Sequence, residues 1–152
     1  MDVKFLADTM LGRLTKWLRI MGYDTRYQPI YEDGAMDIWI NTGHLLLTRQ
    51  KTLINQYPHS LLIRSDHIEE QLKNIKDAGY LSHDRSKWFL RCLRCNILLK
   101  EINNKEVLDK IPEFVLNQTN VKIHFCPSCN RFFWKGSHRS RMTEQLKKWG
   151  YE

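Results

Sequence analysis

Hydrophobic residues in the first half of the chain alternate between short continuous runs and stretches with helical spacing. The continuous runs are typical of buried strands and lie at Val3–Ala7, Leu45–Thr48 and Leu61–Ile63. Between the first two runs, apolar residues from Met10 to Met21 fall on one helix face, and Gly22 follows where a helix C-cap belongs. Strands that alternate with helices predict an α/β domain with a parallel, doubly wound sheet and helices on both faces.

The remaining segments of this half fit the same pattern. Residues 23–27 could form a second strand, and Asp33–Asn41 predicts a short helix closed by Gly43. A last helix is expected to end at Gly79, with Asp66 and Glu69 spaced as a capping box at its start. On the helix between residues 10 and 21, the exposed side should carry Arg13, Lys16 and Arg19.

The pattern changes near residues 81–84. Short β-like pieces then surround two Cys-x-x-Cys pairs, and a helix is expected near Lys105–Ile111. We therefore expect two domains, the α/β domain over residues 1–85 and a smaller domain with a basic C-terminal helix over residues 86–152.

Charge divides the chain at the same place. Residues 1–84 carry 10 Lys+Arg and 11 Asp+Glu, a net charge of −1, whereas residues 85–152 carry 14 and 6, a net charge of +8. A strongly basic half favours a polyanionic partner, with a basic solubilising surface as the alternative. No apolar run is long enough to span a bilayer, and residues 1–5 do not open a signal peptide. We therefore expect a cytoplasmic protein whose cysteines are reduced.

The two cysteine pairs have the spacing of a zinc site. Cys92 and Cys95 form the first pair, and Cys126 and Cys129 form the second after thirty intervening residues. Each two-residue gap lets one tight turn present two sulfurs, and two such turns give a tetrahedral shell with Zn–S distances of roughly 2.3 Å. Four thiolates leave no open position, so the zinc should be structural and should stabilise a small zinc ribbon. A redox pair or two disulfides is the alternative.

Basic and aromatic residues are interleaved just after the second pair. Arg and Lys neutralise phosphates and exposed rings stack on bases, so this tract suits RNA or a ribonucleoprotein. Its candidate RNA-binding residues are Arg131, Trp134, Lys135, His138, Arg139 and Arg141. Alternatively, the rings of Phe132, Phe133 and Trp134 form the core of the ribbon. In the first domain, Arg13, Lys16 and Arg49 are further candidates.

Several polar residues follow the predicted strands. Asp8 follows the first strand, Gln50 follows Leu45–Thr48, Asp66 follows Leu61–Ile63, and Glu32 and Asp33 open a helix. Ligands bind beyond the carboxyl ends of strands in an open parallel sheet, and converging carboxylates there would bind Mg²⁺ or Mn²⁺. Each acid also has a plain alternative as a helix cap.

The stretch Lys4–Leu14 resembles the opening of the Mut-7 C-terminal RNase family, which consists of PIN-like nuclease domains with a C-terminal zinc ribbon. The resemblance continues in order and spacing over nearly the whole chain. It runs through Trp17-Leu18-Arg19, Gly22-Tyr23-Asp24, Leu46-Leu47-Thr48-Arg49, Arg64-Ser65-Asp66, Glu70-Gln71-Leu72, Arg91-Cys92-Leu93-Arg94-Cys95-Asn96, Cys126-Pro127-Ser128-Cys129, Phe133-Trp134-Lys135-Gly136-Ser137-His138 and Met142.

This resemblance implies a PIN-like three-layer fold and a metal-dependent ribonuclease. Its metal ligands would match Asp8, Asp66 and Asp33, with Glu32 and Asp37 as near alternatives for the last. The family's Thr-Arg-Asp stands here as Thr48-Arg49-Gln50, so one expected carboxylate is replaced by an amide. A divalent ion would activate water for phosphodiester cleavage, and the missing charge would weaken its binding. The alternative is a decayed nuclease that binds RNA or a ribonucleoprotein without cleavage. A zinc-stabilised protein-interaction adaptor is a third hypothesis.

Overall fold

The computed structural model describes residues 2–82, 84–102, 109–117 and 121–152. The chain forms two compact units, Met1–Asn96 and Ile97–Glu152. The first cysteine pair thus lies in the first unit, whereas the division expected from sequence near residue 86 places it in the second domain. None of the helices in the described ranges is long and apolar enough to cross a membrane.

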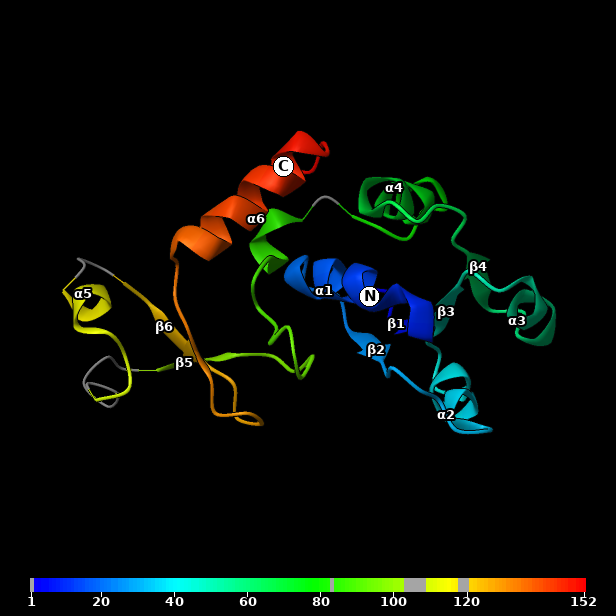
Figure 1. Cartoon of the computed structure of the whole chain (residues 1–152), viewed down its shortest axis with the longest axis horizontal. Helices are drawn as coiled ribbons and strands as arrows, with labels where there is room; N and C mark the ends of the chain where they lie inside the picture. The colour runs from blue at the N-terminus through cyan, green and yellow to red at the C-terminus, as the bar shows by residue number, and fades with distance from the viewer. Residues whose placement is uncertain (1, 83, 103–108, 118–120) are drawn as a thin grey trace. The chain divides into compact units, whose positions relative to one another are not determined.

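A four-stranded parallel sheet forms the centre of the first unit (Figure 1). Its order is β2-β1-β3-β4, and its strands are β1 (Phe5–Ala7), β2 (Thr25–Tyr27), β3 (Leu45–Thr48) and β4 (Ser60–Leu62). Ala7, the last residue of β1, pairs with Tyr27 on one side and Leu47 on the other. The parallel α/β fold expected from the alternating pattern is confirmed.

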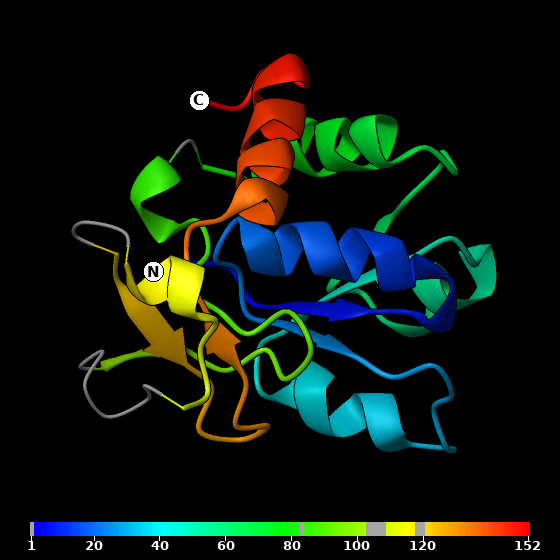
Figure 2. The same ribbon diagram turned by 60° about the vertical axis from the view of Figure 1, so that its left-hand side comes forward.

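Helices cover both faces of this sheet. Figure 2 shows α1 and α4 on one side of it and α2 on the other. The helices are α1 (Gly12–Ile20), α2 (Ala35–Asn41), α3 (Lys51–Gln56) and α4 (Ile68–Asp77), with short 3-10 turns η1 (Thr9–Leu11) and η2 (Arg85–Lys87). The sequence pattern did not predict α3.

Strand periodicity explains how the three layers pack. Leu6 of β1 and Leu46 of β3 pack against Met36 of α2. Successive side chains of a strand point to opposite faces, so Phe5, Leu45 and Leu47 point to the face that carries α1 and α4. All of these strand residues are at most 1% exposed, so both faces of the sheet are buried at the two central strands, β1 and β3.

The expected capping box before α4 is wrong. His67 is the N-cap residue and makes no side-chain cap bond, while Asp66 is exposed. The hydroxyl of Ser65 instead accepts the backbone N–H of His67 at 3.0 Å. Ser and Asp side chains can both accept a backbone N–H at the start of a helix. Here Ser65 accepts it, one residue before the Asp66 that the pattern indicated.

The second unit contains a small antiparallel sheet of order β5-β6-β7. Its strands are β5 (Lys100–Ile102), β6 (Ile123–Phe125) and β7 (Phe132–Phe133), and its helices are α5 (Glu113–Leu116) and α6 (Ser137–Lys148). Ile111, Val115 and Ile123 form its buried core. The basic C-terminal helix corresponds to α6, whereas the helix expected near Lys105–Ile111 falls mostly outside the described residues.

Candidate functional site

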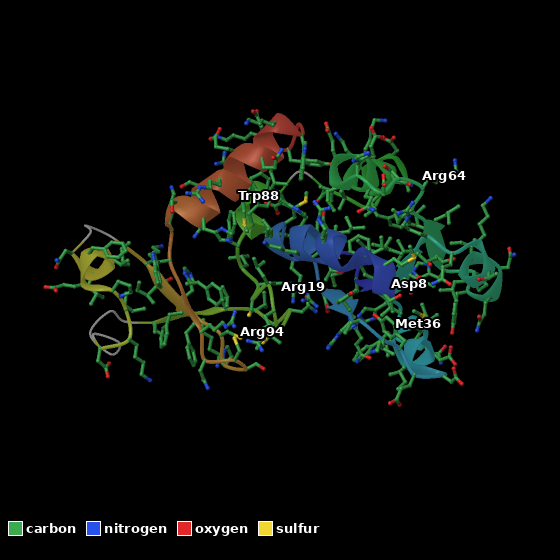
Figure 3. All side chains as sticks on the ribbon, in the orientation of Figure 1. Asp8, Arg19, Met36, Arg64, Trp88 and Arg94 are labelled. Atoms are coloured by element: carbon green, nitrogen blue, oxygen red, sulfur yellow. The ribbon has the colours of Figure 1, made fainter. Side chains whose placement is uncertain are left out.

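The strand order places two polar residues at a topological switch point. The chain runs from β1 outward to β2 on one side, and through β3 to β4 on the other. Asp8 directly follows β1 and Gln50 lies two residues beyond β3, so both stand at the edge where open parallel sheets bind ligands. Asp8 is labelled in Figure 3, beside one end of α1.

Protein donors occupy both oxygens of the Asp8 carboxylate. Oδ1 accepts the backbone N–H of Thr9 at 2.7 Å and its hydroxyl at 3.4 Å. Oδ2 accepts the hydroxyl of Thr48 at 2.8 Å and the side-chain amide Nε2 of Gln50 at 2.7 Å. Asp8 is only 2% exposed, so these bonds replace hydration that its charge would otherwise need. Asp8 therefore also has the capping role that the sequence left open.

Two tyrosines hold the backbone on either side of Asp8. The hydroxyl of Tyr31 donates to the carbonyl of Ala7 at 2.7 Å, and that of Tyr27 donates to the carbonyl of Thr9 at 2.9 Å. Burial raises the pKa of Tyr31 to about 12, which keeps this donor protonated. A Cβ on Gly12 would lie 3.0 Å from the Tyr27 hydroxyl oxygen, so glycine leaves room for this contact. Neither tyrosine carries a motif that the sequence could have revealed.

The other predicted acids, unlike Asp8, lie at exposed positions. Glu32 and Asp33 are exposed before α2, and Asp37 accepts the hydroxyl of Tyr57 at 2.7 Å. The side chain of Asp66 is 73% exposed and pairs with His67 at 3.5 Å. Within the described ranges, the four cysteines are the only group of three or more Cys, His, Asp or Glu placed to hold a metal.

This arrangement does not fit a catalytic Mg²⁺ or Mn²⁺. Such ions need several oxygen ligands with free lone pairs, and Mg²⁺ is usually held by one or two carboxylates together with waters and substrate phosphates. At the switch point, Asp8 supplies one carboxylate whose oxygens already accept four hydrogen bonds. The amide nitrogen of Gln50, which cannot ligate a cation, points at Asp8.

The basic candidates of the first unit differ in how far their side chains are exposed. Arg13 and Lys16 are exposed on α1. Arg49 is half-buried, and its Nη2 donates to the carbonyl of Arg64 at 3.5 Å. Arg19, expected on the exposed side of the same helix, is instead 8% exposed. Its guanidinium donates to backbone carbonyls, so it cannot serve as a free phosphate contact.

The four cysteines do fit a structural zinc. The ligand atoms of Cys92, Cys95, Cys126 and Cys129 all lie within 4.8 Å of one another, as a tetrahedral thiolate shell requires. The backbone N–H of Cys95 points at the Sγ of Cys92 at 3.4 Å, where it would stabilise the charge of a zinc-bound thiolate. Zinc bound here would stabilise the fold rather than supply chemistry, because no ligand position is left open.

An asparagine follows each cysteine pair and completes its turn. Asn96 donates its backbone N–H to the carbonyl of Cys92 at 2.8 Å, and Asn130 donates likewise to Cys126 at 2.9 Å. Their φ angles are 69° and 60°, a left-handed conformation that asparagine tolerates better than most residues. The sequence signal for the matching roles of Asn96 and Asn130 is the Cys-x-x-Cys-Asn spacing, which occurs twice.

The basic tract of the second unit separates into buried and exposed parts. Phe132 and Trp134 pack against the core of Ile111, Val115 and Ile123, which favours the core reading of these rings over base stacking. Arg139 is half-buried, and desolvation lowers the pKa of its guanidinium. The exposed members of the tract are Arg131, Lys135, His138 and Arg141.

Comparison with known proteins identifies one relationship. The family model described as Mut7-C RNAse domain matches residues 3–146, nearly the whole chain. No curated protein and no solved structure shows a significant match to the chain.

Proposed function

Because the chain belongs to the Mut7-C RNAse domain family, we propose that it binds RNA on a nuclease fold whose switch-point site has lost the ability to cut. RNA is the polymer on which the family's name says it acts. The charge distribution supports a polyanionic partner, because residues 85–152 carry a net charge of +8.

One observation carries the second half of this proposal. The Nε2 of Gln50 donates to Oδ2 of Asp8 at 2.7 Å, where a divalent ion would otherwise neutralise the carboxylate. An amide N–H offers only a partial positive charge and cannot activate a water molecule. The Gln50 amide therefore supplies a hydrogen bond to the Asp8 carboxylate but cannot act as a Lewis acid.

RNA binding would rest on exposed cations rather than on the acidic edge. Arg131, Lys135 and Arg141 in the second unit, and Arg13 and Lys16 on α1, have exposed side chains that can reach phosphates. Each phosphate neutralised releases condensed counterions, so the affinity should fall as salt rises.

Metal-dependent cleavage is the second candidate. It is favoured by the position of Asp8, a buried carboxylate at the switch point between β1 and β3, in a chain of an RNase family. Cleavage would require Gln50 to turn away from Asp8 and exposed acids such as Asp33, Asp37 or Asp66 to approach it.

Titration with end-labelled single-stranded RNA tests both candidates in one experiment. We expect anisotropy to report saturable binding whose log affinity falls linearly with log salt. The same samples, run on a denaturing gel after incubation with Mn²⁺, should contain intact RNA. Absence of binding at low salt would refute RNA recognition, and chelator-sensitive shortening of the RNA would favour the second candidate.

A further inference from the structure

The segment that leads into the first cysteine pair is held against the end of α1 within the first unit. The backbone N–H of Phe89 donates to the carbonyl of Ile20 at 2.8 Å, and Nε of Arg91 donates to the carbonyl of Gly22 at 3.0 Å. Gly22 has a φ of 95°, and a Cβ there would lie 2.4 Å from the carbonyl oxygen of Lys87. Residues 87–91 are thus held tightly against the end of α1.

The turn that follows provides a hydrogen-bond partner for the backbone at the outer edge of β2. This strand is the edge of the sheet, and Thr25 at its start is fully buried. The N–H of Thr25 donates to Oδ1 of Asn96 at 2.9 Å, and Nδ2 of Asn96 donates to Oδ1 of Asp24 at 2.7 Å. The outward N–H and C=O groups of a buried residue in an edge strand need partners, and Asn96 supplies the acceptor for the N–H of Thr25.

Arg19 supplies the donor and ties the same edge to the cysteine turn. Its Nε and Nη2 donate to the carbonyl of Thr25 at 3.0 and 2.8 Å. Its Nη1 donates to the carbonyls of Leu93 and Arg94, the two residues between Cys92 and Cys95, at 2.9 and 3.4 Å. Arg19 and Arg94 are labelled in Figure 3. One guanidinium therefore holds both the start of β2 and the turn that presents two thiolates.

We propose that the Cys92–Asn96 turn acts as the outer neighbour of β2, with Arg19 and Asn96 as positioning residues that couple zinc loading to the order of this strand. Zinc fixes Cys92 and Cys95, and thereby fixes the carbonyls and the asparagine that complete the edge of β2. By linkage, an ordered β2 must in turn favour zinc binding. β2 also carries Tyr27, whose hydroxyl donates to the carbonyl of Thr9 beside Asp8. The order of this strand therefore affects how the backbone next to Asp8 is held. The coupling does not depend on RNA binding or cleavage.

Two asparagines provide a matched pair of variants for the test. Asn96 and Asn130 occupy the same position after their cysteine pairs, with φ angles of 69° and 60°, so glycine fits both backbones without strain. Asn96 is 5% exposed and makes two side-chain bonds, whereas Asn130 is exposed and its side chain has no hydrogen bond among those of the described residues.

The experiment measures hydrogen exchange of the Thr25 amide in the full chain, and zinc release into a chelating dye. Chelation should speed Thr25 exchange in the wild type at least about tenfold. Asn96→Gly should speed it comparably in the zinc-loaded protein and should hasten zinc release several-fold, by the reciprocity of linkage. Asn130→Gly should leave Thr25 exchange within about twofold of wild type.

A double variant that exchanges the two side chains distinguishes loss of this contact from general damage to the fold. Asn96→Asp places a second carboxylate against Asp24 and should expose the Thr25 amide, while adding Asp24→Asn should restore both the donor–acceptor pair and its protection. The proposal is overturned if chelation leaves Thr25 exchange unchanged, if Asn130→Gly matches Asn96→Gly, or if the swap fails to restore protection.

Discussion

Gln50 donates its side-chain amide to the Asp8 carboxylate across 2.7 Å, joining the ends of β1 and β3. The resemblance to the nuclease family implied a carboxylate at position 50, and two carboxylates at this separation would repel unless a cation lay between them. The amide removes that repulsion without a cation. The pair is therefore the structural basis for the proposal that this chain binds RNA without cleaving it.

Thr48 should contribute more to stability than its size suggests. Its hydroxyl is buried, donates to Oδ2 of Asp8 at 2.8 Å and accepts the backbone N–H of Gln50 at 3.0 Å. Thr48→Val keeps the shape but leaves a buried carboxylate oxygen short of a donor. We expect a loss of about 2 kcal/mol in the free energy of unfolding, measured by urea denaturation. Thr52→Val, at an exposed site in α3, is the control and should change it by less than about 0.5 kcal/mol. Equal losses in the two variants would contradict this role.

His44 should make the first unit sensitive to mild acid. Its ring is 4% exposed, Nδ1 donates to the carbonyl of Trp39 at 3.1 Å, and Nε2 is buried with no partner among the described residues. Burial lowers the pKa of His44 from its ordinary 6.5, because a proton on Nε2 would have no acceptor. The unfolded chain then binds more protons than the folded one below pH 6.5, so stability should fall as the pH drops through that value.

The melting temperature between pH 7.5 and pH 5 measures this effect. His44→Gln should lower the melting temperature at pH 7.5 but flatten its decline toward pH 5. Burial also lowers the pKa of His124, in the second unit, so His124→Gln separates the two contributions. A decline as steep in His44→Gln as in the wild type would assign the acid sensitivity elsewhere.

Zinc content tests the cysteine site directly. Elemental analysis of the purified protein should find about one zinc per chain. Cys129→Ser removes one thiolate and should weaken zinc binding by at least about tenfold in competition with a chelator. Ser128→Ala, in the same turn but outside the ligand shell, should not. Zinc-free protein with disulfide-bonded cysteines would contradict the assignment.

Hydrophobic pattern predicted much of the fold, and its failures have identifiable causes. Short apolar runs located β1, β3 and β4, whereas α3 was missed because none of its residues is buried and so it lacks an apolar stripe. The rule that ligands bind beyond the carboxyl ends of parallel strands correctly predicted that Asp8 and Gln50 lie at one edge of the sheet. Arg19 was expected to be exposed because the pattern describes one helix at a time, and residues 93 and 94 that cover it lie about 74 positions away.

RNA affinity should depend on exposed cations of the second unit. Replacing Arg131, Lys135 and Arg141 together by alanine should weaken binding and reduce the steepness of log affinity against log salt, by roughly 0.7 for each lost phosphate contact. Lys73→Ala is the control, since Lys73 is exposed but paired with Asp77 at 3.0 Å. An unchanged slope in the triple variant would mean that these residues do not contact phosphate.

The most direct measurement is a cleavage assay of wild type, Gln50→Asp and the double variant Gln50→Asp with Asp8→Asn on single-stranded RNA, with Mn²⁺ and with chelator. Restoring a carboxylate beside Asp8 should create a metal site, and one ligand charge is worth a few kcal/mol, or roughly a hundredfold in rate. We predict no chelator-sensitive cleavage by the wild type, clear cleavage by Gln50→Asp, and its loss in the double variant. Mn²⁺-dependent, chelator-sensitive cleavage by the wild type would contradict the account.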